Sequence, residues 1–314
     1  MAFDFKLVSA PFRMQPGLRR IAPGSAQLTP SRPHGRHLRE KMAVLASTPE
    51  EALAATAGFD AGPVLREIAR ESALASLSAF AFEDANDCSA PQLAWAIRDG
   101  RPEGTGEAAI GDLLASLPAS KRATALLCLA FEEDFAVIDG ATATIPWLAV
   151  CLPSRWAPEH KVGKHFAEVH APVADNAILL EASDRLARLV TGPDRWERFV
   201  WTISADPRLH QHPARGDVRW PDLADAEAIA SLASLRHEHQ TFIPVQGTGQ
   251  AVFTIRVASE PLDAALRSRD DASRLHDALA SMTPAVLAYR GLESVRARLL
   301  EALKRRIDSL PAAS

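Results

Sequence analysis

Arg236, Glu238 and Gln240 alternate along the sequence and could together bind a charged ligand. In an extended segment, all three side chains would point to one side, because successive residues of a strand face opposite ways. Burying three polar groups on one face is costly unless they find partners. The face therefore either opens to solvent or lines a polar cavity, and we favour the cavity. The alternative is a surface ion pair between Arg236 and Glu238, worth about 0–1 kcal/mol.

His170 is a second candidate, because it ends a predicted helix two residues before Pro172. A proline there stops the helix and fixes where the imidazole points. On the residues alone, interaction with the helix dipole is the more frequent role of such a histidine. Lys161, Lys164 and His165 recur at helical spacing upstream. With Arg155 they form either a solvated basic stripe or a site for anionic groups.

Other sequence patterns exclude several classes of site. Cys88, Cys128 and Cys151 form no C-x-x-C pair, which argues against an iron–sulfur cluster, a cysteine zinc site and covalently attached haem. The pairs His210/His212 and His237/His239 have strand-ligand spacing but no third ligand, so we expect solvated histidines. The sequence has no GxSxG elbow, Walker A loop or GxGxxG turn.

The elements that would position these residues are helical at first and mixed later. We predict an extended arm over 1–37 and then helices without strands up to about residue 124, including 91–98 and 107–117. Strand signals follow over 131–139 and 142–152, on the two sides of Asp139-Gly140, and over 198–204. A hairpin is predicted with strands over 240–245 and 250–257, turned by Gly247-Thr248-Gly249. Helices are predicted over 158–170, 176–190, 224–235, 271–280 and 289–309. Two strands, a helical insertion and three more strands are the order of a PAS-type domain, so we expect an α+β fold with a five-stranded antiparallel sheet over 125–314.

Composition sets broad limits. Of the 314 residues, 47% are hydrophobic and 24% are charged, and the net charge is −4, which is typical of a globular chain without a nucleic-acid footprint. No apolar run reaches the roughly 20 residues of a membrane span, and the first ten residues do not form a secretory signal. A cytoplasmic location is therefore expected.

Several blocks resemble the haem-binding alpha subunit of the haem-dependent oxidative N-demethylases. In chain order these blocks are Leu152–Lys164, Val169–Val173, Leu235–Phe242, Ala251–Val257, Ser281–Pro284 and Tyr289–Leu292. The resemblance covers about residues 125 to 305. The sequence departs from the family pattern at Ala174, Val200 and His239, positions expected near the pocket, so these changes bear on the substrate more than on the haem.

The resemblance implies a PAS-type domain that carries haem b and receives electrons from a separate flavin and iron–sulfur reductase. His170 would be the axial iron ligand, and Arg155, Lys161, Lys164 and His165 would bind the propionates. Glu238 would hold a cationic secondary amine. An arginine would stabilise negative charge on bound oxygen, and the candidates are Arg236, Arg198 and Arg256.

Two other functions are compatible with the same scaffold, since fold alone does not settle function. One is a haem-based gas sensor or regulator, although the chain ends soon after its last predicted helix and leaves little room for an output domain. The other is a protein that has lost haem and acts through protein interactions.

Overall fold

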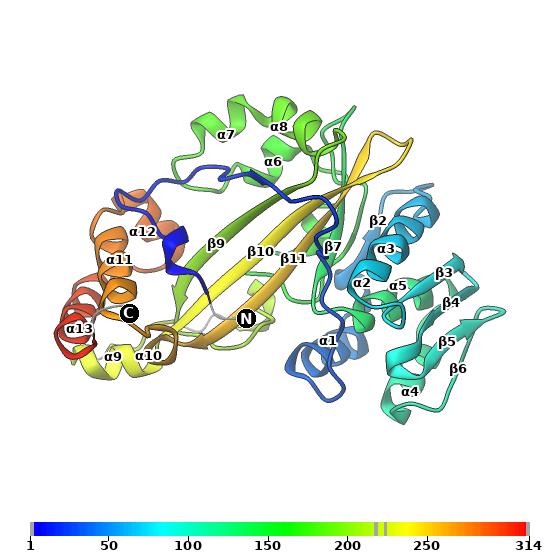
Figure 1. Ribbon diagram of the computed structural model, residues 1–314, viewed down its shortest axis with the longest axis horizontal. Helices are drawn as coiled ribbons and strands as arrows, with labels where there is room; N and C mark the ends of the chain where they lie inside the picture. Colours follow the sequence, from blue (N-terminus) through cyan, green and yellow to red (C-terminus); the bar gives the residue numbers. More distant parts are fainter. Residues whose placement is uncertain (1–2, 217–218, 223–224, 312–314) are drawn as a thin grey trace.

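The computed structural model describes residues 3–216, 219–222 and 225–311, which form an α+β fold with two antiparallel sheets (Figure 1). The larger sheet has seven strands in the order β1-β9-β10-β11-β7-β8-β2, and the smaller has four in the order β3-β4-β5-β6. The α+β class is thus confirmed, but the main sheet has seven strands where five were expected.

Five of the seven strands of the main sheet come from the chain after residue 130. They are β1 (Arg19–Arg20), β2 (Leu53–Ala55), β7 (Asp134–Asp139), β8 (Trp147–Ala149), β9 (Trp196–Ser204), β10 (Ser234–Val245) and β11 (Gln250–Pro261). The small sheet consists of β3 (Ala81–Asp84), β4 (Asp87–Ala90), β5 (Trp95–Arg98) and β6 (Arg101–Gly104).

Helices precede, interrupt and follow the main sheet. The first group is α1 (Arg36–Ser47), α2 (Pro49–Ala52), α3 (Gly62–Ala75), α4 (Ala108–Ser116) and α5 (Ala119–Ala130). The insertion between β8 and β9 carries α6 (Phe166–His170), α7 (Ala177–Glu181) and α8 (Ser183–Val190). The last group is α9 (Ala226–Leu232), α10 (Leu262–Ala265), α11 (Arg269–Ala280), α12 (Pro284–Arg290) and α13 (Arg296–Ser309). Short 3-10 turns are η1 (Phe5–Leu7), η2 (Pro91–Leu93), η3 (Pro158–His160) and η4 (Pro213–Arg215). No helix in the described part of the chain is both long and apolar enough to cross a membrane.

The long β10–β11 hairpin forms the centre of the main sheet. Its two strands have twelve residues each and pair from Ser234↔Pro261 to Val245↔Gln250. The turn needs Gly247 and Gly249, whose φ angles of 74° and 68° are unfavourable for residues with a Cβ atom. The predicted hairpin is confirmed, although both strands extend further than the sequence pattern indicated.

The N-terminal half differs from the prediction of a strand-free helical layer. Residues 91–98, predicted as a helix, instead form one 3-10 turn and β5, which pairs with β4 and β6. The cause is long-range backbone pairing, together with Ala94, whose φ of 53° ends the helical turn. Leu53–Ala55 likewise adds to the main sheet beside β8.

Two predicted helices are also interrupted. The one expected over 158–170 consists of η3 and α6, because Gly163 has a φ of 74° and the backbone of 163–165 pairs with Thr144 and Ile145. The C-terminal one breaks at Gly291, which caps α12 in the left-handed conformation. The helix expected over 224–235 is α9, and position 224 lies outside the described residues.

Two main hydrophobic clusters flank the sheet. One packs α1, α3 and α5 against β7, β8 and β11, and includes Leu45, Ile68 and Phe135. The other packs α9, α11 and α13 against β9 and β10, and includes Ile203, Leu235 and Leu299. In Figure 1 the small sheet and the C-terminal helices lie at opposite ends of the main sheet, while α6–α8 lie above its upper edge.

Candidate functional site

A cavity of about 590 Å³ lies over the main sheet and is enclosed by segments far apart in the sequence. Its floor comes from β7, β9, β10 and β11. The 154–161 segment, α6 and α12 supply its walls, together with residues 14–16 of the N-terminal arm. Apolar walls are provided by Ile138, Ile145, Leu148, Phe253 and Ile255. The cavity can therefore take a largely apolar group whose polar parts meet a few defined side chains.

Arg236, Glu238 and Gln240 all line this cavity, as their alternation on β10 predicted. Glu238 is the single carboxylate among the described residues that line it. Ser154 donates a hydrogen bond to its Oε1, and Gln240 Nε2 donates to its Oε2 at 2.6 Å. Both carboxylate oxygens are therefore held in place. Ser154 belongs to the Leu152–Lys164 block, but its type and spacing alone did not predict this role.

Arg236 is 1% exposed and is fixed by its surroundings. Its Nε donates to Ser154 Oγ at 2.8 Å, and its terminal nitrogens donate to the carbonyls of Arg208 and Leu209 at 2.9 and 2.8 Å. Burial lowers the pKa of Arg236 to about 10. Among the described residues no ion pair joins Arg236 directly to Glu238, and Ser154 connects the two side chains instead.

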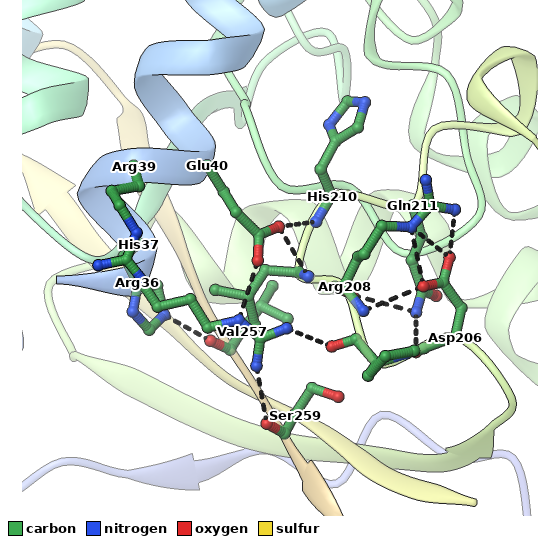
Figure 2. A network of polar contacts seen from close by, with 12 residues as sticks. Arg36, His37, Arg39, Glu40, Asp206, Arg208, His210, Gln211, Val257 and Ser259 are labelled. Atoms are coloured by element: carbon green, nitrogen blue, oxygen red, sulfur yellow. Dashed lines mark hydrogen bonds and ion pairs between the residues drawn. The ribbon is translucent and has the colours of Figure 1, made fainter. Parts of the chain in front are cut away.

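Side chains of α1 fix the loop over 207–210, which carries those carbonyls (Figure 2). Glu40 Oε2 on α1 accepts hydrogen bonds from the backbone N–H groups of Leu209 and His210, at 2.8 and 2.9 Å. Arg36 donates to the carbonyl oxygens of Pro207 and Ser259. This loop therefore presents its carbonyls to Arg236 in a fixed position.

Arg198 lies on β9 and lines the cavity with no hydrogen bond from its guanidinium to any described residue; its buried Nε has no partner. Burial lowers its pKa, while the charge of Glu238 acts in the opposite direction. Arg256, the third predicted arginine, does not line the cavity. Its Nε and a terminal nitrogen bind Glu132 at 2.9 and 2.5 Å, which gives no support to a role in the cavity.

His170 ends α6 and lines the cavity. Its Nδ1 lies 2.8 Å from the Phe166 carbonyl oxygen and donates to it, so Nε2 keeps its lone pair. Nε2 makes no hydrogen bond to any described residue. Burial lowers the pKa of His170 to about 4, and the backbone hydrogen bond opposes that effect only in part. At neutral pH the imidazole is neutral and Nε2 is available as a ligand.

The predicted propionate-binding residues divide into two groups. Arg155 and Lys161 line the cavity, and burial lowers the pKa of Lys161. Lys164 is exposed and pairs with Glu168 at 3.7 Å. His165 caps α6 through Nδ1 and donates from Nε2 to Asp184 at 3.0 Å. Because η3 and α6 are separated by a turn, Lys164 and His165 do not share a helical face with Lys161.

The two histidine pairs are less solvated than expected. His212 is 4% exposed, accepts from Ala214 N–H through Nδ1 at 3.1 Å, and approaches Glu159 and Glu51 through Nε2. Since Nδ1 accepts a hydrogen bond, Nε2 carries the proton and donates to Glu159 rather than offering a lone pair to a metal. His239 binds Glu197 at 2.8 Å, and both ring nitrogens of His237 are buried without a partner.

Two residues of α12 complete the cavity and were missed as site residues. Tyr289 and Arg290 line it next to the C-terminus of the helix, although both occur in a quoted sequence block. The Arg290 guanidinium lies over the rings of Phe12 and Trp201, at 4.5 and 5.3 Å from the ring centroids, and one nitrogen donates to the Trp201 carbonyl. The signal for these contacts is three-dimensional, because Phe12 is almost 280 residues away.

The cavity combines an imidazole nitrogen without a hydrogen bond, apolar walls and cationic side chains, which suits a group with an apolar body, a metal and anionic edges. Residues 105–300, well over half of the chain, match the family described as haem-dependent oxidative N-demethylase, alpha subunit-like. The chain belongs to this family. Membership indicates haem dependence, an oxidative N-demethylase-like function and a partner subunit.

The residues of the cavity fit haem. Non-covalent haem needs an axial donor, an apolar slot and cations for its propionates. His170 Nε2 has a lone pair that no described residue engages, so it can serve as the axial ligand. The walls from β7, β8 and β11 are apolar, and Arg155 and Lys161 are cationic side chains that line the cavity. Cys88, Cys128 and Cys151 are buried and free, so thiolate ligation of a group in the cavity is not indicated.

Proposed function

We propose that this chain is the oxygenase component of a haem-dependent oxidative N-demethylase and acts on a small secondary amine. The observation that carries the proposal is the content of one cavity: a histidine with a free Nε2, a carboxylate held at both oxygens, and a guanidinium without a partner. No single one of these features is specific, but together they provide a ligand for iron and a counterion for an amine.

His170 is the proposed axial ligand of haem b, with Arg155 and Lys161 as partners of the propionates. When bound, the haem supplies the activation of oxygen and the oxidation of the amine. The five strands β7–β11 occur in the order of two strands, a helical insertion and three strands, which supports a PAS-like haem-binding unit over 125–314.

Glu238 is the proposed anchor for the substrate. A secondary amine is protonated at neutral pH, and a partly buried ammonium needs an anionic partner. Glu238 supplies that charge, while Ser154 and Gln240 orient its two oxygens and can leave the remaining lone pairs for N–H groups. The Glu238 carboxylate can also accept the proton that the amine must lose before it is oxidised at nitrogen or at the adjacent carbon.

Arg198 is the proposed cation that donates hydrogen bonds to molecules bound in the cavity. Among the three predicted arginines, Arg236 is bound to backbone carbonyls and Arg256 is bound to Glu132, which leaves Arg198 with free N–H groups on the cavity. Much of the cavity wall is apolar, so the charge of Arg198 acts more strongly there than at the surface.

Electrons are proposed to come from a separate reductase with flavin and iron–sulfur groups. The chain has neither a dinucleotide-binding motif nor cluster-forming cysteines, and the family description names an alpha subunit. This part of the proposal rests on the family resemblance.

Glu238→Gln tests the proposal, because the amide keeps the shape of the side chain and removes its charge. Titration of the haem-loaded protein with dimethylamine, N-methylethylamine and trimethylamine should perturb the haem spectrum. The variant should bind the responding amine roughly tenfold to a hundredfold more weakly, since a charge-assisted hydrogen bond contributes about 1.5–3 kcal/mol. Glu181→Gln, at an exposed position on α7, is the matched control.

One result of these titrations would contradict the proposed function. If no amine perturbs the spectrum while oxygen, CO and NO bind readily, the demethylase function is excluded. The haem-based sensor would then be the better account of the same cavity.

A further inference from the structure

The position of Arg198 relative to Glu238 indicates what kind of amine the cavity accepts. In the β9–β10 register Arg198 is opposite Gln240, and Glu238 is opposite Val200. Arg198 and Glu238 are therefore diagonal neighbours on the cavity face, a relationship in which the backbones lie about 7–8 Å apart. Side chains of this length can meet across such a distance.

They do not meet here. Within the described structure Arg198 forms no ion pair of 4 Å or less and no hydrogen bond, and its Nε is buried. Glu238 is held instead by Ser154 and Gln240. One positive and one negative group thus face the same space, separated, and each retains unused hydrogen-bonding capacity.

Arg198 is partly buried and its Nε is buried without a hydrogen bond, which is costly, so an anionic partner that enters the cavity would stabilise this guanidinium. The other cations of the cavity are already occupied or assigned. Arg236 binds backbone carbonyls, and Arg155 and Lys161 are the proposed partners of the propionates. Arg290 lies over Phe12 and Trp201 and donates to the Trp201 carbonyl, although its Nε has no partner. Arg198 is the cation that remains.

We propose that the substrate is a zwitterion: a small N-methyl amino acid whose ammonium binds Glu238 and whose carboxylate binds Arg198. This inference rests on the proposed function, since it assigns the substrate class of the same site. A guanidinium recognises a carboxylate through two parallel hydrogen bonds, and such pairs are among the stronger polar contacts in proteins. A simple dialkylamine would leave Arg198 without this partner.

A haem propionate is also a carboxylate, so the experiment must distinguish the two sources. The haem-loaded protein is titrated by calorimetry with N-methylglycine and with N-methylglycinamide, which has nearly the same shape and the same amine but no carboxylate. The titrations are repeated with Arg198→Gln, with Arg198→Lys, and with Arg188→Gln as a control that removes an exposed positive charge. Haem affinity and thermal unfolding are measured for every variant.

We expect N-methylglycine to bind the unaltered protein roughly tenfold to a hundredfold more tightly than its amide. Arg198→Gln should reduce this preference to about threefold or less, Arg198→Lys should retain part of it, and Arg188→Gln should leave it unchanged.

Other outcomes overturn the inference. Equal affinity for acid and amide excludes a zwitterionic substrate while leaving amine binding intact, and a preference that survives in Arg198→Gln excludes Arg198 as the carboxylate partner. A large loss of haem affinity in Arg198→Gln assigns this arginine to a propionate. If neither compound nor any other amine binds, the proposed function itself fails and the substrate class fails with it.

Discussion

The Nδ1 of His170 lies 2.8 Å from the carbonyl oxygen of Phe166, one helical turn earlier in α6. The carbonyl can only accept, so this contact places the hydrogen on Nδ1 and the lone pair on Nε2. The Phe166 ring packs on the imidazole with 4.1 Å between ring centroids. Phe166 therefore sets both the tautomer and the orientation of His170, as hydrogen-bonded neighbours do for metal-binding histidines.

The lowered pKa of His170 predicts an unusual pH dependence of haem binding. A proton competes with iron for Nε2, and the pKa of about 4 means that this competition begins well below the ordinary value of 6.5. Haem affinity should therefore stay constant from about pH 8 to about pH 5 and fall as the pH approaches about 4. Spectrophotometric haem titrations across this range measure it. If haem affinity already declined near pH 6.5, the lowered pKa of the buried His170 side chain would be contradicted.

Ser154 connects the two charged residues of β10, so its removal should affect both. In Ser154→Ala, Arg236 Nε and Glu238 Oε1 each lose a partner. We expect the free energy of unfolding to fall by about 1–3 kcal/mol, which is the cost of leaving buried polar groups without hydrogen bonds. Amine affinity should fall several-fold because the carboxylate is no longer fixed. Ser154→Thr, which keeps the hydroxyl, should restore most of both properties, whereas unchanged amine affinity in the alanine variant would rule out the positioning role.

Glu133 predicts a separate effect of pH on stability. It is 2% exposed, and burial raises its pKa to about 7, from an ordinary 4.5. Between about pH 4.5 and about pH 7 the folded chain thus binds more protons at this site than the unfolded chain, so the contribution of Glu133 to stability falls as pH rises. Above about pH 7 the loss is complete.

Glu133→Gln should remove this dependence. Relative to the unaltered protein, the variant should gain up to about 3 kcal/mol between pH 5 and pH 8. Urea unfolding at several pH values measures the difference, and Glu83→Gln is an exposed control. A difference that does not change with pH would show that Glu133 is ionised in the folded state throughout this range.

The partner subunit leads to a prediction about turnover. Given NADPH and oxygen, the purified chain should oxidise no amine, because its sequence contains no recognisable flavin- or nicotinamide-binding motif. Reduction by dithionite followed by oxygen should give a single turnover, and an added reductase should give repeated turnover. Sustained consumption of NADPH by the chain alone would contradict the separate reductase.

The sequence predicted those parts of the fold that depend on local pattern. The structure confirms the predicted turn at Gly247–Gly249 and the shared face of Arg236, Glu238 and Gln240. Both could be predicted because backbone conformation and side-chain direction are properties of short segments. The strand at Trp95–Arg98 was missed since its hydrogen bonds go to β4 and β6, and pairing between strands leaves little trace in one segment.

The site was predictable to a similar extent. His170 and Glu238 were named from the sequence, and both line the cavity. The roles of the arginines depend on distant partners: Arg236 is occupied by carbonyls of the 208–209 loop, and Arg256 by Glu132, 124 residues away. Arg198 differs from them in having no partner, which only the three-dimensional structure reveals.

The central claim is that His170 holds haem in this cavity, and the absorption spectrum of the purified protein tests it most directly. The unaltered protein, supplied with haem, should show a Soret band of a histidine-ligated haem. His170→Ala should lose that band or shift it grossly while keeping its far-UV circular dichroism. His165→Ala, which removes a histidine whose two nitrogens are already engaged, should leave the band in place. A normal Soret band in His170→Ala would contradict the account.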